Sequence, residues 1–346
     1  MSKVLIAIVL LAVLALPANA LSITAPEVPK EQEKLMPQHT ESFREGLIEL
    51  LNDVLPLLRP DLAEAANAAV ALIAAAMTAS ILKSASDAVK YTVKLACSAC
   101  ICSVLFLSAN SLIRLGTDTI EKISEYGKLL LPVMASAMAA QGSFTGSAAL
   151  YTGTAVFDAV LCSVFSGILI PAIYLYLALA AADSVTTDHS LKKIKDLFKN
   201  GVAWFLKTSL TIYISYMGIT GVISGTADAA ALKTTRSALS AAVPVVGGIL
   251  ANASEAVLVS AGLVKNAAGI YGIFAILAIF LAPFLRIGVH YLILKLSEAV
   301  CAILDEKEVS ELIGDFSGAM GLILGMTGAV CFLQLMSTVC FLKGAG

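Results

Sequence analysis

From about residue 63 onward, the chain alternates between long apolar runs and short polar breaks. Hydrophobic residues make up 58% of the chain and charged residues only 14%, and the mean hydropathy is +0.88. Soluble domains usually carry about 25% charged residues, so a chain this apolar has too little polar surface to cover a globule in water. The pattern predicts an all-α, polytopic transmembrane helical bundle.

Seven helical spans are predicted, and two other apolar stretches contain Pro and Gly residues that interrupt a helix. Backbone broken at membrane depth is tolerated only where protein or a water-filled cavity covers it. We therefore expect about seven spans plus two Pro/Gly-broken re-entrant hairpins, with nine full spans as the alternative. The expected spans are 63–82, 95–113, 155–182, 201–224, 267–285, 287–304 and 317–342, and the expected hairpins are 129–147 and 242–264.

The N-terminal segment predicts export. Lys3 precedes an apolar core at 4–16, Pro17 ends that core, and the Ala-Asn-Ala sequence at 18–20 fits a cleavage site. Residues 1–20 are therefore expected to be a signal peptide, with an uncleaved anchor as the alternative. Residues 21–62 are expected to form an exported acidic linker and an amphipathic helix, and residues 63–346 the polytopic membrane domain.

The prolines suggest a weak internal repeat. Pro132 precedes Pro244 by the same offset as Pro171 precedes Pro283, since 244 − 132 and 283 − 171 both equal 112. At this offset, repeats over 91–200 and 203–304 would each contain one of the broken stretches. Interrupted hydrophobic segments at corresponding places in two repeats indicate a transport site.

The distribution of Lys and Arg predicts the orientation. Lys residues cluster within 83–94 and within 192–199, whereas the loop expected at 305–316 is acidic. With the N-terminus outside and seven spans, both clusters, Arg286 and Lys343 face the cytoplasm, and the acidic loop faces out. Arg286 is expected at a cytoplasmic turn, where its side chain can reach water.

Ionisable and helix-breaking residues at membrane depth are the candidate functional residues. A charge at the bilayer centre costs about 2.5–3.5 kcal/mol on insertion scales, so it usually faces a partner or water. For the region from Glu255 to Lys265, the alternative is a purely structural ion pair. The expected lining of a pore or transport path is Pro132, Gly142, Asp158, Pro244, Gly247, Gly248, Glu255, Lys265 and Asn266.

Glycines recur along the last expected span. They allow another helix to approach closely, either within the bundle or between copies in a homo-oligomer. The expected packing residues are Gly314, Gly318, Gly321 and Gly325.

No motif of a soluble enzyme is present. The sequence contains neither H-E-x-x-H nor G-x-x-x-x-G-K-[ST], and its seven Cys lie within or beside apolar runs, which favours buried thiols. A formal net charge of −2 gives no electrostatic footprint for nucleic acid. We therefore predict no enzyme activity, no catalytic residues, no metal and no cofactor.

Several segments resemble the stage III sporulation protein AE family. The resemblance is most specific over 218–269, and the order of signal peptide, acidic exported segment and multispan body is similar as well. The residues that carry it are Gly221–Asp228, Leu232–Thr234, Val243–Gly248, Glu255 and Val264–Gly269, with Leu131–Val133 and Ile170–Pro171 further upstream.

This resemblance implies a membrane subunit of a trans-envelope, secretion-like channel complex between mother cell and forespore, required for late forespore development. It implies a multi-pass location in the mother-cell membrane that surrounds the forespore. The implied partners are other membrane proteins of the stage III sporulation A operon, an associated ATPase, and a forespore membrane protein across the intermembrane space. The alternatives are a non-conducting scaffold of that complex and an independent small-molecule permease.

Overall fold

The computed structural model is helical in every regular element that it describes, which confirms the all-α expectation. It describes residues 25–37, 43–85, 90–141, 144–185, 191–242, 247–304 and 306–343. The short elements are α2 (Lys30–Glu33), α3 (Phe43–Val54), the 3-10 turn η2 (Leu55–Leu57) and the π-helical turn η4 (Phe165–Leu169). The long helices are α4 (Leu58–Ala85), α5 (Lys90–Ala140), α6 (Phe144–Val164), α7 (Ile170–Val185), α8 (Lys192–Ala242), α9 (Gly247–Ile303) and α10 (Lys307–Lys343).

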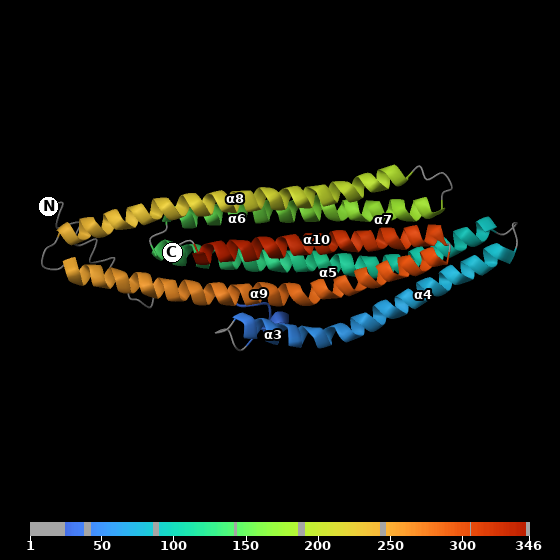
Figure 1. The fold of residues 1–346 in the computed structure, drawn as a ribbon, viewed down its shortest axis with the longest axis horizontal. Coiled ribbons are helices and arrows are strands. Elements are labelled where there is room, and N and C mark those ends of the chain that lie inside the picture. Colours follow the sequence, from blue (N-terminus) through green and yellow to red (C-terminus); the bar gives the residue numbers. More distant parts are fainter. Residues whose placement is uncertain are drawn as a thin grey trace.

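The long helices lie side by side along one axis (Figure 1), and successive crossings alternate in direction, with α6, η4 and α7 together forming one crossing. One end of the bundle holds the C-terminal ends of α4, α7 and α9 and the N-terminal ends of α5, α8 and α10, and we call it the lysine end because Lys192 and Lys195 lie there. The opposite end holds the C-terminal ends of α5 and α10 and the N-terminal end of α6. The C-terminal part of α8 and the N-terminal part of α9 extend beyond these helix ends in Figure 1, and we call these two parts the α8–α9 hairpin.

Five helical segments are long and apolar enough to cross a membrane: 43–81, 95–140, 146–185, 266–303 and 307–342. They contain between 36 and 46 residues. At 1.5 Å per residue, each is therefore about 54–69 Å long, well above the roughly 30 Å of a bilayer's hydrocarbon core. These segments fit a membrane protein, and each helix has length to extend beyond the hydrocarbon.

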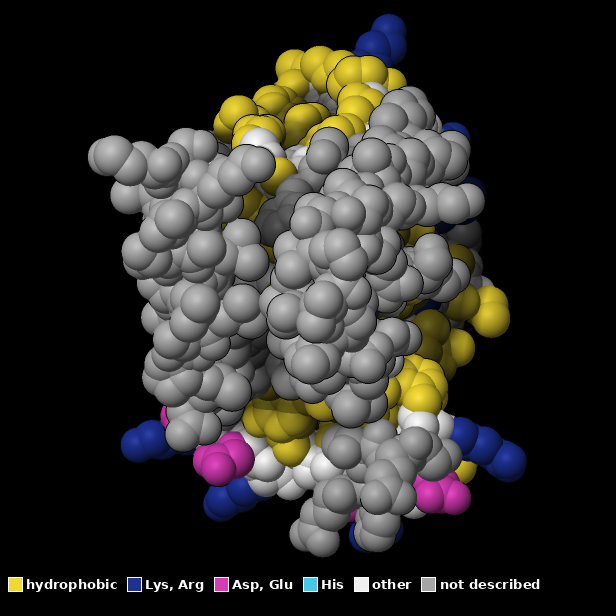
Figure 2. All heavy atoms as spheres, turned by 90° about the vertical axis from the view of Figure 1, so that its left-hand side faces the viewer, with side chains coloured by type: hydrophobic (Ala, Val, Ile, Leu, Met, Phe, Trp, Pro, Cys, Tyr) yellow, Lys and Arg dark blue, Asp and Glu magenta, His cyan; other side chains and the backbone are white. Residues whose placement is uncertain are grey.

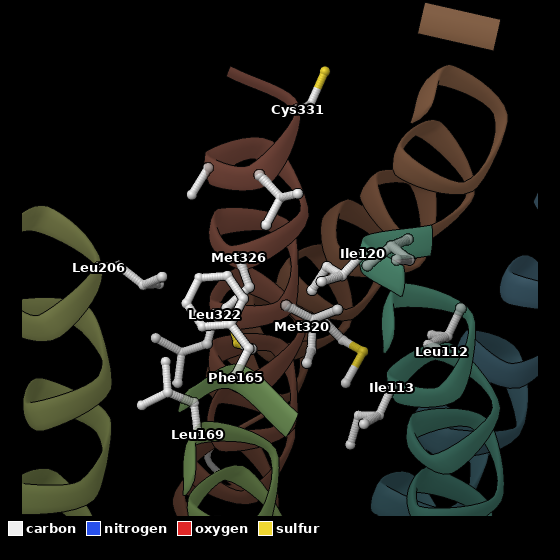
Figure 3. Packing of buried hydrophobic residues seen from close by; sticks show 14 of the residues in the cluster. Leu112, Ile113, Ile120, Phe165, Leu169, Leu206, Met320, Leu322, Met326 and Cys331 are labelled. Atoms are coloured by element: carbon white, nitrogen blue, oxygen red, sulfur yellow. The ribbon is translucent and has the colours of Figure 1, made fainter. Parts of the chain in front are cut away.

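Helix α10 lies at the centre of the bundle and packs against α5, α7, α8 and α9. Figure 3 shows its Met320, Leu322 and Met326 between two groups of apolar side chains. One group comes from η4 and α8, and the other comes from α5. All of them are buried: Phe165, Leu169 and Leu206 in the first group, and Leu112, Ile113 and Ile120 in the second.

Large apolar side chains also reach the outer surface. On α6 and α7, Val160 is 53% exposed and Leu175 is 46% exposed, and Trp204 on α8 is 67% exposed. In the end-on view of Figure 2, hydrophobic side chains lie along the upper side of the molecule, which is the side of α8 in Figure 1. An apolar exterior of this kind suits lipid rather than water.

The segment before α4 packs on the bundle more closely than expected. Val28, in the expected linker, is buried in the core, and Glu31 forms an ion pair of 2.8 Å with Lys122 on α5. This ion pair lowers the pKa of Glu31. The expected amphipathic helix is present as α3, whose Leu50 and Val54 are buried. The predicted signal peptide lies outside the described residues.

The turn expected at Arg286 does not exist. Helix α9 runs from Gly247 to Ile303 without a break, so the expected spans 267–285 and 287–304 form one helix. Pro283 lies inside it. A proline in an apolar helix removes one backbone hydrogen bond, which neighbouring groups can replace, so the helix continues through this position.

This continuous helix also overturns the predicted orientation. The expected acidic loop 305–316 is mostly the first part of α10, and its Glu311 lies 3.5 Å from Lys192, between the carboxylate Oε1 and the ammonium Nζ. The basic cluster and the acidic segment therefore lie at the same end of the bundle. The end of α10 at Lys343 lies at the opposite end, so it cannot share a side with the Lys192 cluster.

The two broken stretches are not separate hairpins in the helices described. Pro132 lies inside α5, which continues to Ala140. Helices α8 and α9 contain 51 and 57 residues, and only positions 243–246 separate them in sequence. Gly142 and Pro244 lie outside the described residues. A re-entrant path through the membrane and the internal repeat stay predictions.

Gly153 on α6 allows the ring of Tyr216 on α8 to pack against its backbone, and the Tyr216 hydroxyl donates a 2.8 Å hydrogen bond to the Ala149 carbonyl. A methyl group at position 153 would overlap that ring. We expect Gly153→Ala to lower the free energy of unfolding by about 1–3 kcal/mol, as overpacked cores do. Thermal unfolding of the purified protein in detergent, followed by circular dichroism, measures this.

Gly201→Ala on α8 is the matched control, because nothing lies within 4 Å of a Cβ atom there. This change should leave stability unchanged or raise it by up to about 1 kcal/mol through helix propensity. Equal effects of the two variants would contradict the packing described for α6 and α8.

A candidate polar site inside the helical bundle

Asp158 on α6 is a carboxylate buried in an apolar bundle, only 6% exposed. Its Oδ2 accepts a 2.5 Å hydrogen bond from the Ser124 hydroxyl on α5, and its Oδ1 accepts a 3.0 Å hydrogen bond from the Gln334 amide on α10. A buried carboxylate is tolerated when its oxygens are paired in this way. Asp158 therefore joins three helices through one side chain.

A glycine makes room for this cluster. A Cβ atom at position 127 of α5 would overlap the side-chain amide of Gln334. Gly127 thus lets the amide lie against the α5 backbone and reach Asp158. The buried Tyr213 of α8 donates a 3.2 Å hydrogen bond to the carbonyl of Leu333, the neighbour of Gln334 on α10. Helix α8 therefore contacts α10 at the same height along the bundle as the Asp158 cluster.

A second buried polar cluster lies at the lysine end. The Lys195 ammonium of α8 is 3.0 Å from Oδ2 of Asp183 on α7 and 2.6 Å from Oδ2 of Asp315 on α10. The Tyr176 hydroxyl donates a 2.9 Å hydrogen bond to the other oxygen of Asp315. Lys195 and Asp183 are almost fully buried, so this cluster fixes α7, α8 and α10 relative to one another.

The two carboxylates also set the protonation of Lys195. Burial alone lowers the pKa of this ammonium group, but the hydrogen bonds and attraction from Asp315 and Asp183 outweigh it and raise the pKa above its usual value. A raised folded-state pKa means that the stabilisation is complete below the unfolded pKa of about 10.4, and is lost as the pH rises through the folded value. Lys195 therefore stays charged at neutral pH.

A third charged pair joins α9 to α4. The Arg286 guanidinium Nε is 2.8 Å from Oδ1 of Asp61 on α4. His290, one turn further along α9, is buried. Arg286 lies near the middle of the apolar segment 266–303, and Asp61 near the middle of 43–81. This ion pair is thus held at the depth of two candidate spans rather than at their ends.

Helix α5 carries five charged side chains on its outer face, which we call the α5 stripe. They are spaced by four, three, four and three residues, so they share one side of the helix. All five are exposed although they lie within the candidate span 95–140. Each would cost about 2.5–3.5 kcal/mol if it faced the bilayer centre. The stripe consists of Arg114, Asp118, Glu121, Glu125 and Lys128.

The structure brings few of the predicted lining residues together. Asp158 is in the buried cluster, whereas Pro132 and Asn266 are exposed on α5 and α9. Gly247, Gly248, Glu255 and Lys265 have helical backbone in α9, but their side chains lie outside the described residues. Within residues 25–37, 43–85, 90–141 and the later described ranges, no group of His, Cys, Asp or Glu is placed to hold a metal ion.

The predicted packing glycines contact side chains of neighbouring helices. A Cβ atom at Gly314 would meet the carboxylate of Glu298 on α9, and one at Gly318 would meet Lys199 and the Tyr176 hydroxyl. A Cβ atom at Gly321 would lie 3.3 Å from the Tyr291 ring, and one at Gly325 would lie 3.4 Å from Leu206. These contacts are within one chain.

Several polar residues escaped the sequence prediction. Ser124 and Gln334 are uncharged and have no local signal that would link them to Asp158. Lys195 resembles several surface lysines in sequence, since only the fold shows which of them is buried. The α5 stripe does leave a signal, because its 4-3-4-3 spacing is visible in the sequence, whereas hydropathy averaged over a window hides it.

Removing the Asp158 carboxylate should destabilise the bundle. Asp158→Ala leaves the Ser124 hydroxyl and the Gln334 amide without their buried acceptor, which should cost about 1–3 kcal/mol. Asp158→Ala, Gln334→Ala and the double variant form a thermodynamic cycle. We expect a coupling of at least about 0.6 kcal/mol, the average for hydrogen bonds in membrane helices. Additive effects in chemical denaturation would contradict the Asp158–Gln334 bond.

Lys195→Met should be more damaging, because it leaves Asp183 and Asp315 as buried charges without their cation. The expected loss is about 3–5 kcal/mol, as for other broken buried ion pairs. Lys193→Met is the matched control, since Lys193 is exposed on the same turn of α8. Similar melting temperatures for the two variants would contradict a buried role for Lys195.

Comparisons with known proteins agree with these observations. The family described as stage III sporulation protein AE matches residues 33–345. The stage III sporulation protein AE of Bacillus subtilis (strain 168) is 22% identical over 200 residues, which cover 57% of this chain and 50% of that protein. The chain thus aligns with about half the length of this curated relative. No solved structure matches it.

The family match covers nearly the whole chain, from 33 to 345, and the long apolar helices are those expected of a membrane protein. The chain belongs to the stage III sporulation protein AE family.

Proposed function

We propose that the chain is a membrane subunit of a trans-envelope, secretion-like channel complex between mother cell and forespore, required for late forespore development. Membership of the family gives it a role in sporulation. Five helices suited to a membrane support a multi-pass location in the mother-cell membrane around the forespore. Its partners would be other membrane proteins of the stage III A operon, their ATPase, and a forespore membrane protein.

The observation that carries the proposal is the Arg286–Asp61 ion pair at the depth of two candidate spans. Ionisable groups are costly there, and they usually mark substrate or ion pathways. In a non-conducting scaffold, the same pair would serve only to hold α4 against α9. The Arg286 side chain is 40% exposed, whereas Asp61 is buried, so the guanidinium can border a path along the α4–α9 face while its carboxylate partner lies in the core.

The charge distribution supports one orientation of this subunit. Positively charged residues near span ends usually face the cytoplasm, and Lys192, Lys193, Lys195 and Lys199 lie at the lysine end of the bundle. With that end in the mother-cell cytoplasm, the α8–α9 hairpin extends on the opposite side (Figure 1). The hairpin would then face the space between the two membranes, where a forespore partner would be met.

Arg286→Gln in the full chain tests this function. In a sporulating host whose own copy is deleted, we expect late forespore-specific reporter activity to fall by about tenfold or more, since the paired charge at span depth is lost. Reporter activity is compared per amount of protein, measured by immunoblot of the membrane fraction, because Asp61 is buried and the loss of its cation also lowers stability.

Lys295→Gln is the matched control on α9, where Lys295 pairs with Glu298 at 2.7 Å on the helix surface. This variant should support normal reporter activity. Full activity of Arg286→Gln at normal abundance would remove the support for a conducting role and favour the non-conducting scaffold.

A further inference from the structure

We propose that the α5 stripe lines a water-filled passage enclosed by several copies of this chain. The inference rests on the proposed function and deepens it, since it names the surface along which the channel's path would run. It begins with the position of the stripe. From Arg114 to Lys128, the stripe is about 21 Å long at the rise of an α-helix. It lies well inside the candidate span 95–140 and stops short of both of its ends.

The same face of α5 is apolar on either side of the stripe. Leu107 is 78% exposed and Leu129 is 58% exposed, yet between them, in a part of the helix that is described throughout, no large hydrophobic side chain is exposed. Elsewhere the outer surface of the bundle offers apolar side chains at comparable depth, such as Val160 and Trp204. The stripe is therefore a local patch unsuited to lipid, whereas the neighbouring described surface of α6 and α8 carries apolar side chains.

Among the residues that the structure describes, none buries the five side chains of the stripe, and the packed interior provides no passage. Helix α5 turns its other side to the core, where Ile113, Ile120 and Ile123 are almost completely buried against the bundle. The centre of the bundle is filled by α10 (Figure 3). A path for water through a single chain would have to displace this packing, so the polar surface available for a path is on the outside.

Several copies of the chain together can enclose the stripe and keep it away from lipid. Membrane chains commonly assemble in closed rings, in which every subunit presents the same surface to the centre. The stripe has an acidic middle, Asp118, Glu121 and Glu125, with one basic residue at each end. In a ring these carboxylates form an acidic band, the arrangement that lines cation-conducting pores. Exposed Pro132 lies one turn beyond Lys128 on the same face.

Thiol labelling in membranes tests the inference. The seven native Cys are replaced, and a single Cys is placed in the full chain at Glu121 or Glu125, or at Val160 or Leu175 as controls on the apolar surface. A charged, membrane-impermeant methanethiosulfonate reagent should modify Glu121→Cys and Glu125→Cys about tenfold faster than the controls, because it needs a water-exposed thiolate. Equally slow modification at all four positions would overturn the passage.

The second readout asks whether other copies enclose it. Two differently tagged copies are expressed together, and a bifunctional thiol reagent is added to the membranes. Glu121→Cys should give cross-linked products that carry both tags, and Val160→Cys should not. Reaction at Glu121→Cys without such products would show that another protein bounds the passage and would overturn the role of copies.

Asp118→Cys is measured in both experiments as well. It takes the place of Glu121→Cys or Glu125→Cys if either of these variants does not accumulate in the membrane. These measurements do not depend on export or on sporulation. If the stripe reacts and cross-links but Arg286→Gln leaves reporter activity normal, the inference stands and the proposed function fails. If the stripe neither reacts nor cross-links but Arg286→Gln abolishes reporter activity, the inference fails and the proposed function stands.

Discussion

The structure depends on the close approach of neighbouring helices to α10. An apolar bundle gains no hydrophobic driving force in lipid, so its helices associate through packing and a few internal hydrogen bonds. The glycines of α10 supply the packing, since Gly314 and Gly318 receive polar side chains from α8 and α9 against the α10 backbone. Because α10 is central, each of these contacts fixes another helix as well.

Two buried polar clusters then fix the level of each helix along the axis. The Lys195 cluster meets α10 at Asp315, and the Asp158 cluster meets it at Gln334. These two residues are separated by about 28 Å along α10 at the rise of an α-helix, which is close to the roughly 30 Å thickness of a bilayer's hydrocarbon core. A sliding movement of α10 by one turn would break both clusters, so they define a single register for a band of about membrane thickness.

The helices and one residue of the candidate site could be predicted from local sequence. The contacts between helices could not, for a physical reason. Hydropathy and periodicity identified helices throughout, and the cost of a buried charge pointed to Asp158. Pro132 and Arg286 were misleading, because prolines and charges are typical of turns and helix ends, whereas in this bundle α5 and α9 continue through them. The partners of Asp158 and Lys195 lie on other helices, and a window of local sequence cannot show which helices become neighbours.

The continuity of α9 has the widest consequence, because each crossing of the bundle reverses the side on which the next segment lies. If a turn occurred at Arg286, the chain would cross twice between Asn266 and Ile303 and α10 would begin on the side opposite Lys192. A single helix crosses once, so α10 must begin beside α8. The Lys192–Glu311 and Lys195–Asp315 contacts follow from this parity, and those ion pairs in turn stabilise the arrangement that the uninterrupted helix imposes.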